Sequence, residues 1–139
     1  MKTLGNVLFF LLTMVTMMAC DETIEPKDSP SDLLMGTWIN PTPVDTFWQY
    51  ERAAQLDNGA YGFSFKSNDQ FIERKNEGWC GTPPITLVNF EGTWSKKDSL
   101  ITINVDYWGG KADYQWKIIS LDDHHLVIYK VNETYGYNE

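Results

Sequence analysis

From residue 34 onward, short runs of alternating hydrophobic and polar residues are separated by turn-forming residues. Such alternation predicts half-buried β-strands, because successive side chains of a strand point to opposite faces. Tyr61, Phe63 and Phe65 share one face of an early run. Ser67-Asn68-Asp69 then breaks the pattern and residues 70–76 resume it, as expected for a hairpin. Further strands are predicted at 85–96, 100–105, 113–120 and 124–131.

The spacing of the turns favours an all-β domain. Strands that recur every 8 to 12 residues or so, with polar turns between them, are typical of a sandwich or a barrel rather than of βαβ units. A sheet with one aromatic face must be covered by a second layer or must close on itself, and closure removes exposed edges. We therefore predict a small up-and-down antiparallel β-barrel, with a two-sheet β-sandwich as the alternative.

Two segments do not follow the alternation. Residues 44–58 have apolar positions at helical spacing, and they could form a short helix or an irregular strand followed by a long loop. Residues 78–86 are predicted to be a loop, because Pro83-Pro84 cannot lie in a central strand.

The N-terminus has the pattern of an export signal. Lys2 precedes an apolar run from Val7 to Ala19, which is long enough for the hydrophobic region of a signal peptide but too short to span a bilayer comfortably. Residues 20–33 are acidic and contain two prolines, a composition typical of an extended linker. The chain thus divides into a signal peptide (1–19), a flexible tether (20–33) and a barrel domain (34–139).

The boundary Met17-Met18-Ala19-Cys20 resembles a bacterial lipoprotein signal, in which a small residue precedes the cysteine that becomes the acylated N-terminus. This resemblance implies that Cys20 carries lipid, with palmitate-type acyl chains, and that the protein is tethered to the outer membrane of a Gram-negative bacterium. It would then be periplasmic or surface-exposed. A plain signal peptide that happens to contain a cysteine remains the alternative.

The domain begins with Gly36-Thr37-Trp38, and a second Gly92-Thr93-Trp94 falls within a predicted strand. A Gly-x-Trp at the start of an antiparallel barrel resembles the lipocalin signature, and the resemblance to lipocalin-like domains of small bacterial lipoproteins spans about residues 34–131. It implies that Trp38 closes one barrel end and that the interior holds a small hydrophobic ligand. The last predicted strand contains Lys130 but no arginine that could pack on Trp38.

Charge narrows the range of partners. The chain has 19 acidic residues against 11 basic ones, for a net charge of −8. Nucleic acid is therefore disfavoured, because binding to phosphates needs a basic surface. An acidic surface attracts basic proteins, so an envelope protein-interaction module or an inhibitor of a basic protein is an alternative function.

The polar residues suggest no enzyme, metal site or cofactor. His124 and His125 are adjacent in a strand and point to opposite faces, so we interpret them as polar residues beside the turn at Asp122-Asp123. Cys80 lies among apolar residues and is expected to be a buried, inert thiol, with a disulfide to another chain as the alternative. The remaining candidates for catalysis are carboxylates, but these lie in predicted turns, where Asp is favoured for its hydrogen bonds to the backbone. They are Asp57, Asp69, Asp98, Asp122 and Asp123.

The aromatic residues carry the main functional prediction, which is a non-enzymatic protein that binds a small apolar molecule. Barrels of eight strands can hold one small ligand, although their interior is just wide enough for side chains to fill it completely. The proposed ligand-binding residues are Trp38, Tyr61, Phe63, Phe65, Trp94 and Trp116. Ile118 is expected to line the same interior.

Overall fold

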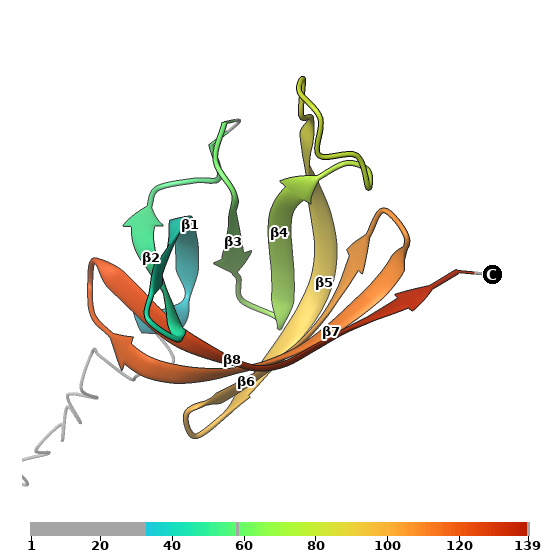
Figure 1. Cartoon of the computed structure of the whole chain (residues 1–139). Helices are drawn as coiled ribbons and strands as arrows, with labels where there is room; N and C mark the ends of the chain where they lie inside the picture. The colour runs from blue at the N-terminus through green and yellow to red at the C-terminus, as the bar shows by residue number, and fades with distance from the viewer. Residues whose placement is uncertain (1–32, 58, 139) are drawn as a thin grey trace, which may run out of the picture.

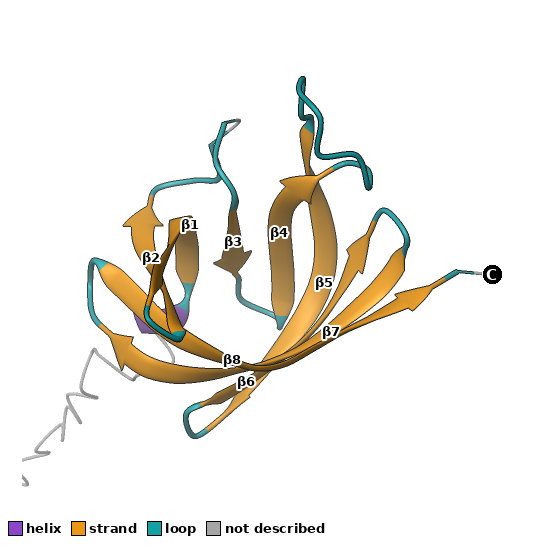
Figure 2. Ribbon diagram, viewed as in Figure 1, coloured by secondary structure: helices purple, strands orange, loops and turns teal. Residues whose placement is uncertain are grey.

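A computed structural model describes residues 33–57 and 59–138, and eight antiparallel strands form a closed barrel (Figures 1 and 2). The predicted all-β barrel is therefore confirmed, and the two-sheet sandwich is excluded. The predicted signal peptide, Cys20 and all of the tether except Leu33 lie outside the described residues. The strands are β1 (Gly36–Val44), β2 (Phe47–Ala53), β3 (Gly62–Phe65), β4 (Gln70–Asn76), β5 (Leu87–Lys97), β6 (Leu100–Tyr107), β7 (Gly110–Leu121) and β8 (His125–Tyr137).

From β3 to β8, each strand pairs with the next one along the chain. The β1–β2 hairpin closes the barrel, with β2 paired to β8 and β1 paired to β3. β1 therefore lies between β2 and β3, and the loop that joins β2 to β3 crosses the end of β1. Asn40 has a φ of 55°, and the β1–β2 register shifts between Ile39 and Thr42. This irregularity bends β1, as β-bulges commonly bend a strand.

The turns lie where the sequence placed them. Asn68 and Asp69 join β3 to β4 with positive φ angles of 62° and 58°, and Asp98 joins β5 to β6 with a φ of 54°. Asn and Asp tolerate this left-handed conformation better than most residues. The ambiguous segment 44–58 contains strand β2 and then a loop, so no helix forms within its described part. β8 extends beyond the predicted position 131 to Tyr137.

Side chains fill the middle of the barrel. Phe63 is the centre of an aromatic cluster, with ring centroids 4.7 Å from Tyr50, 5.3 Å from Phe65 and 5.1 Å from Trp116. The aliphatic side chains of β6 and β8 complete the core: Ile101, Ile103, Val105, Leu126 and Ile128 are all fully buried. Edge-to-face and tilted aromatic pairs of this kind add to the stability that burial alone provides.

One end of the barrel, which we call the closed end, is sealed by Trp38. This side chain is fully buried, and its indole N–H donates a hydrogen bond to the Leu34 carbonyl over 2.9 Å. The guanidinium of Arg52 lies 4.2 Å from the ring centroid, and it donates to the backbone carbonyls of Met35 (3.0 Å) and Leu33. Arg52 and Trp38 are direct cross-strand partners, which explains the contact.

The glycine that precedes Trp38 is explained by the same contact. Gly36 has a φ of 126°, and a Cβ at this position would lie 2.6 Å from Nη1 of Arg52. A side chain would therefore strain the backbone and displace the guanidinium. The cation that packs on Trp38 comes from β2, whereas Lys130 of the last strand lies elsewhere, 5.0 Å from the ring of Trp48.

Candidate functional site

The end opposite Trp38, the open end, is formed by the β4–β5 loop, the β6–β7 turn and the C-terminal part of β8 (Figure 1). A cavity of about 290 Å³ lies there, and we call it the open-end cavity. Asn76 and Gly78 contribute to its wall, and its other lining residues are Tyr61, Lys75, Trp79, Tyr107, Trp108 and Tyr135. Five of these eight residues are aromatic, so the wall is largely made of rings.

The rings differ in how firmly they are held. Tyr107 is buried and packs edge to face against Trp108 at 5.5 Å and against Tyr135 at 5.3 Å. Its hydroxyl also donates to the Gly136 carbonyl over 3.2 Å. Trp79, on the β4–β5 loop, is 80% exposed and makes no ring contact with another aromatic residue of the described part of the chain. The wall thus has one side held by ring contacts and one largely exposed tryptophan.

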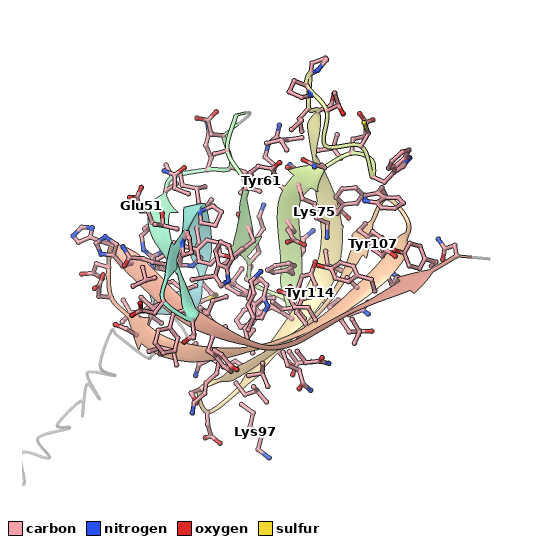
Figure 3. The ribbon with its side chains drawn as sticks, in the orientation of Figure 1. Glu51, Tyr61, Lys75, Lys97, Tyr107 and Tyr114 are labelled. Atoms are coloured by element: carbon pink, nitrogen blue, oxygen red, sulfur yellow. The ribbon has the colours of Figure 1, made fainter. Side chains whose placement is uncertain are left out.

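Lys75 forms the polar floor of the open-end cavity (Figure 3). Its ammonium donates to Oε2 of Glu73 over 2.7 Å and to the Tyr114 hydroxyl over 3.1 Å, and that hydroxyl donates to the same Glu73 oxygen over 3.0 Å. The rings of Phe90, Tyr107 and Tyr114 surround the ammonium, with centroids at 5.4 to 5.8 Å. The third N–H of Lys75 has no acceptor within residues 33–57 and 59–138.

A second carboxylate, Glu133, contacts the aromatic core. Glu133 of β8 accepts a hydrogen bond from the indole N–H of Trp116 over 2.9 Å and forms an ion pair with Lys130, whose Nζ lies 3.1 Å from Oε1. Burial raises the pKa of Tyr50, and the negative charges of Glu73 and Glu133 raise it further. Burial likewise raises the pKa of Tyr114, with Glu73 as the next cause. Both hydroxyls therefore stay protonated at neutral pH and remain hydrogen-bond donors.

The structure separates the six residues predicted from the sequence to bind ligand. Trp38 seals the closed end, and Phe63, Phe65 and Trp116 are packed in the core. Trp94 is partly buried near the closed end, where its ring lies 4.9 Å from that of Phe65 and its N–H donates to the Lys66 carbonyl over 3.1 Å. Of the six, Tyr61 lines the open-end cavity.

Sequence reasoning missed most of the cavity wall. Trp79, Trp108 and Tyr135 lie on a loop, at a turn and near the chain end, outside the alternating runs that were used to find the interior. Trp79 and Trp108 could have been found from the sequence. Large aromatic residues in loops and turns do not contribute to a core, so their presence there indicates another role. Lys75 shares the inward face of β4 with Phe71 and Glu73. It was not selected from the sequence, because a charged residue is not expected on an inward face unless it is paired.

The remaining polar candidates lie apart from this cavity. The backbone N–H groups of His124 and His125 both donate to Asp122 over 2.7 Å, which holds the pKa of that carboxyl below its usual range. The two histidines lie at the turn as expected, but only His125 belongs to a strand, since β8 begins there and His124 is part of the turn. Cys80 is exposed, so the expectation of a buried thiol is wrong. The loop that contains it projects beyond the barrel end (Figure 1). Its sequence neighbours Trp79, Pro83 and Pro84 are themselves exposed and do not bury it.

Another hollow, of about 470 Å³, lies at the closed end. It is lined by Leu33, Ile118 and Leu121 together with three residues around the β5–β6 turn, Lys96, Asp98 and Ser99. Three of its six lining side chains are aliphatic, and none is aromatic. The part of the chain described here contains no group of three or more His, Cys, Asp or Glu residues that could hold a metal ion.

The described ranges 33–57 and 59–138 include no helix with the length and apolar character needed to cross a bilayer. No protein-family model, no curated protein and no solved structure matches this chain. The assignment of function therefore depends on the geometry of the barrel and of its open end.

Proposed function

We propose that this protein is a non-enzymatic binding protein, tethered to the outer membrane through lipid on Cys20, which holds a small ligand in the open-end cavity of a lipocalin-like barrel. The observation that carries the proposal is a concave site with five aromatic rings and one ammonium group. Ligand sites are typically concave and largely apolar, with a few polar groups that fix the orientation of the ligand.

The position of the cavity supports a ligand bound at the mouth rather than deep inside. Phe63 and Trp116 occupy the barrel interior, with ring centroids 5.1 Å apart. A ligand of retinoid or fatty-acid size would have to displace this core. The contact is therefore made by an apolar face of the ligand that lies against the aromatic wall, while its other side remains in water.

The lipid tether follows from the sequence, in which the apolar run ends at Ala19-Cys20 and an acidic linker follows. Two or more acyl chains would hold the protein stably at a membrane. Mass spectrometry of the mature N-terminus tests this proposal. Acylated Cys20 is the expected result, and release of Cys20→Ser into the soluble fraction should accompany it, whereas an unmodified N-terminus would contradict the tether.

Ligand binding is tested by thermal-shift and tryptophan-fluorescence titrations of the full chain with fatty acids, retinoids, porphyrins, nucleosides and neutral sugars. At least one class should stabilise the protein, and Trp79→Ala should abolish the effect. The matched control is Tyr129→Ala, which removes a half-exposed ring from the outside of β8. If no compound in the panel binds, or if Trp79→Ala binds normally, the proposed function is wrong.

An interaction with another protein is a second candidate. Three apolar side chains on the outer surface of β7 and β8, Ile119, Tyr129 and Val131, are each more than 40% exposed. Exposed apolar side chains are a common component of protein contacts. Because the chain is acidic, binding to a basic envelope protein such as a lysozyme should weaken steeply with salt. Binding that is absent, or that does not depend on salt, would exclude this candidate.

A further inference from the structure

We infer that the ligand of the open-end cavity is a neutral saccharide, with one pyranose face stacked on Trp79 and its hydroxyl groups bound by Lys75 and Asn76. This inference rests on the proposed function and specifies the class of ligand. Three properties of the cavity support it: its shallow position, its free aromatic face and the absence of a net charge at its floor.

The first property is depth. The cavity is open to solvent, and the packed rings of Tyr114 and Trp116, whose centroids are 5.2 Å apart, lie in the barrel interior. A bound molecule therefore keeps much of its surface in water. A wholly apolar ligand would lose part of the hydrophobic free energy at such a site, because only the buried area contributes. A polar molecule with one apolar face is better suited to it.

The second property is the aromatic wall. Trp79 is 80% exposed and offers a free ring face, while Tyr61 and Trp108, both more than 40% exposed, line the same cavity. The axial C–H bonds of a pyranose ring form a flat apolar patch with a slight positive charge. The negative face of an indole or phenol ring attracts such a patch.

The third property is the charge of the floor. Lys75 is paired with Glu73 at 2.7 Å, so the two groups together carry no net charge. A carboxylate or phosphate would approach Lys75 against the repulsion of Glu73 and of the acidic chain as a whole. An amine would find no unpaired carboxylate at this floor, because Glu73 is already paired with Lys75. A sugar hydroxyl accepts from the free N–H of Lys75 without either penalty.

The hydrogen-bonding groups around this floor fit a polyhydroxylated ligand. Asn76 accepts a hydrogen bond from the Tyr61 hydroxyl through Oδ1 over 2.7 Å, which leaves its Nδ2 amide to donate. Lys75 and Asn76 are successive residues of β4, so their side chains leave opposite faces of the strand. Both nevertheless line the cavity, because Asn76 is the last residue of β4. A ligand with several hydroxyl groups can accept from each of these two separate donors.

The test uses the purified full chain in lipid nanodiscs with cellobiose, maltose and N,N′-diacetylchitobiose as probes. Saturation-transfer difference NMR identifies which sugar protons contact the protein, and quenching of tryptophan fluorescence gives the affinity. We expect at least one of these disaccharides to bind through its ring C–H protons. Glucuronic acid and glucosamine, which carry opposite charges, should bind more weakly than methyl glucoside.

Variants locate the site. Trp79→Ala should weaken disaccharide binding about tenfold or more, whereas Tyr129→Ala should leave it unchanged. Lys75→Met should also weaken it about tenfold, and Asn76→Ala serves the same purpose if the lysine variant fails to fold. Near-ultraviolet circular dichroism of each variant confirms that the barrel is intact.

The outcomes separate this inference from the proposed function. If fatty acids, retinoids, porphyrins or nucleosides bind in a Trp79-dependent manner while the three disaccharides do not, the saccharide inference is wrong and the binding function stands. If nothing binds, both are wrong. Disaccharide binding that Trp79→Ala and Lys75→Met leave unchanged would place the sugar elsewhere and would also overturn the inference.

Discussion

The two ends of the barrel use the same kinds of side chain for different purposes. At the closed end, Trp38 is fully buried, and the guanidinium of Arg52 donates hydrogen bonds to three backbone carbonyls. At the open end, Trp79 is exposed. The Lys75 ammonium donates to the Glu73 carboxylate and to the Tyr114 hydroxyl, and its third N–H has no acceptor among the described residues. A ring and a cation thus seal one end and leave a binding surface at the other.

The difference lies in what satisfies the polar atoms. Backbone carbonyls are fixed in place, so the Arg52 contacts hold Leu33 and Met35 beside Trp38. The Lys75–Glu73 pair is made by two side chains of one strand, both about one-fifth exposed, and a ligand can share it without unfolding the barrel. Stability is therefore expected to concentrate at the closed end and binding at the open end.

The largest expected effect is that of Trp38→Ala. Removal of this fully buried indole leaves a large cavity, and we expect a loss of about 3–5 kcal/mol in the free energy of unfolding. Trp79→Ala, the matched change at the open end, should alter stability by no more than about 0.5 kcal/mol. Urea denaturation measures both. Similar losses for the two variants would break the contrast between the ends.

Arg52→Lys sharpens the contrast at the closed end. Lysine keeps the positive charge, but its ammonium cannot reproduce the planar fork that reaches the carbonyls of Leu33, Met35 and Asp123. We expect a loss of about 1–3 kcal/mol in the free energy of unfolding. Lys97→Ala, an exposed change on the same half of the barrel (Figure 3), should cost almost nothing. If Arg52→Lys is as harmless as this control, the arginine does not seal the end.

The floor of the open-end cavity should show coupling between two charges. Lys75→Met leaves Glu73 without its ion pair in a mostly buried position, and we expect a loss of about 1–2 kcal/mol in stability. The double variant Lys75→Met with Glu73→Gln should recover part of this loss, since no unpaired charge remains. Thermal denaturation of the single and double variants measures the coupling. Strictly additive effects would mean that the two side chains act independently.

The smallest effect is expected from pH. The pKa values of Tyr50 and Tyr114 are raised above the usual value of about 10. The folded state therefore holds these protons more tightly than the unfolded state does. Their contribution to stability is complete below about pH 10 and is lost as the pH rises above it.

Tyr114→Phe tests this linkage. At neutral pH the variant loses the hydrogen bonds to Glu73 and Lys75 and should be less stable by about 0.5–1.5 kcal/mol. Above pH 10 or so, its melting temperature should fall less steeply than that of the wild type. Circular dichroism follows the melting temperature, and tyrosinate absorbance reports the ionisation. Equally steep declines in the two proteins would argue against a raised pKa at Tyr114.

Much of the fold could be predicted from the sequence because its signals are local. The alternation in 113–120, the turn residues at 67–69 and the prolines of the 78–86 loop each act through neighbours in the chain, and the structure confirms the strand, the turn and the loop. The predicted strand at 61–65 is present as Gly62–Phe65, without Tyr61. Segment 44–58 remained ambiguous because its apolar spacing suited either a helix or a strand. Pairing of β2 with β1 and β8 decided for the strand.

The candidate site was less accessible. Alternation placed Phe63, Phe65 and Trp116 correctly inside the barrel, but it could not tell an interior that is full from one that is empty. That depends on the sum of side-chain volumes across eight strands. Tyr61 was chosen for its parity with Phe63, and it reaches the cavity from a loop rather than from the interior face of a strand.

By itself, the sequence determined most of the strands, most of their turns and the all-β class, because alternation and turn chemistry act over a few residues. Only the tertiary structure decided which cation packs on Trp38, since Arg52 lies opposite it solely through the β1–β2 register. It likewise brought Lys75 together with three aromatic residues that are distant from one another in sequence. These are Trp79 of the β4–β5 loop, Trp108 of the β6–β7 turn and Tyr135 of β8. Such contacts depend on how the barrel closes, and no local pattern in the chain encodes that closure.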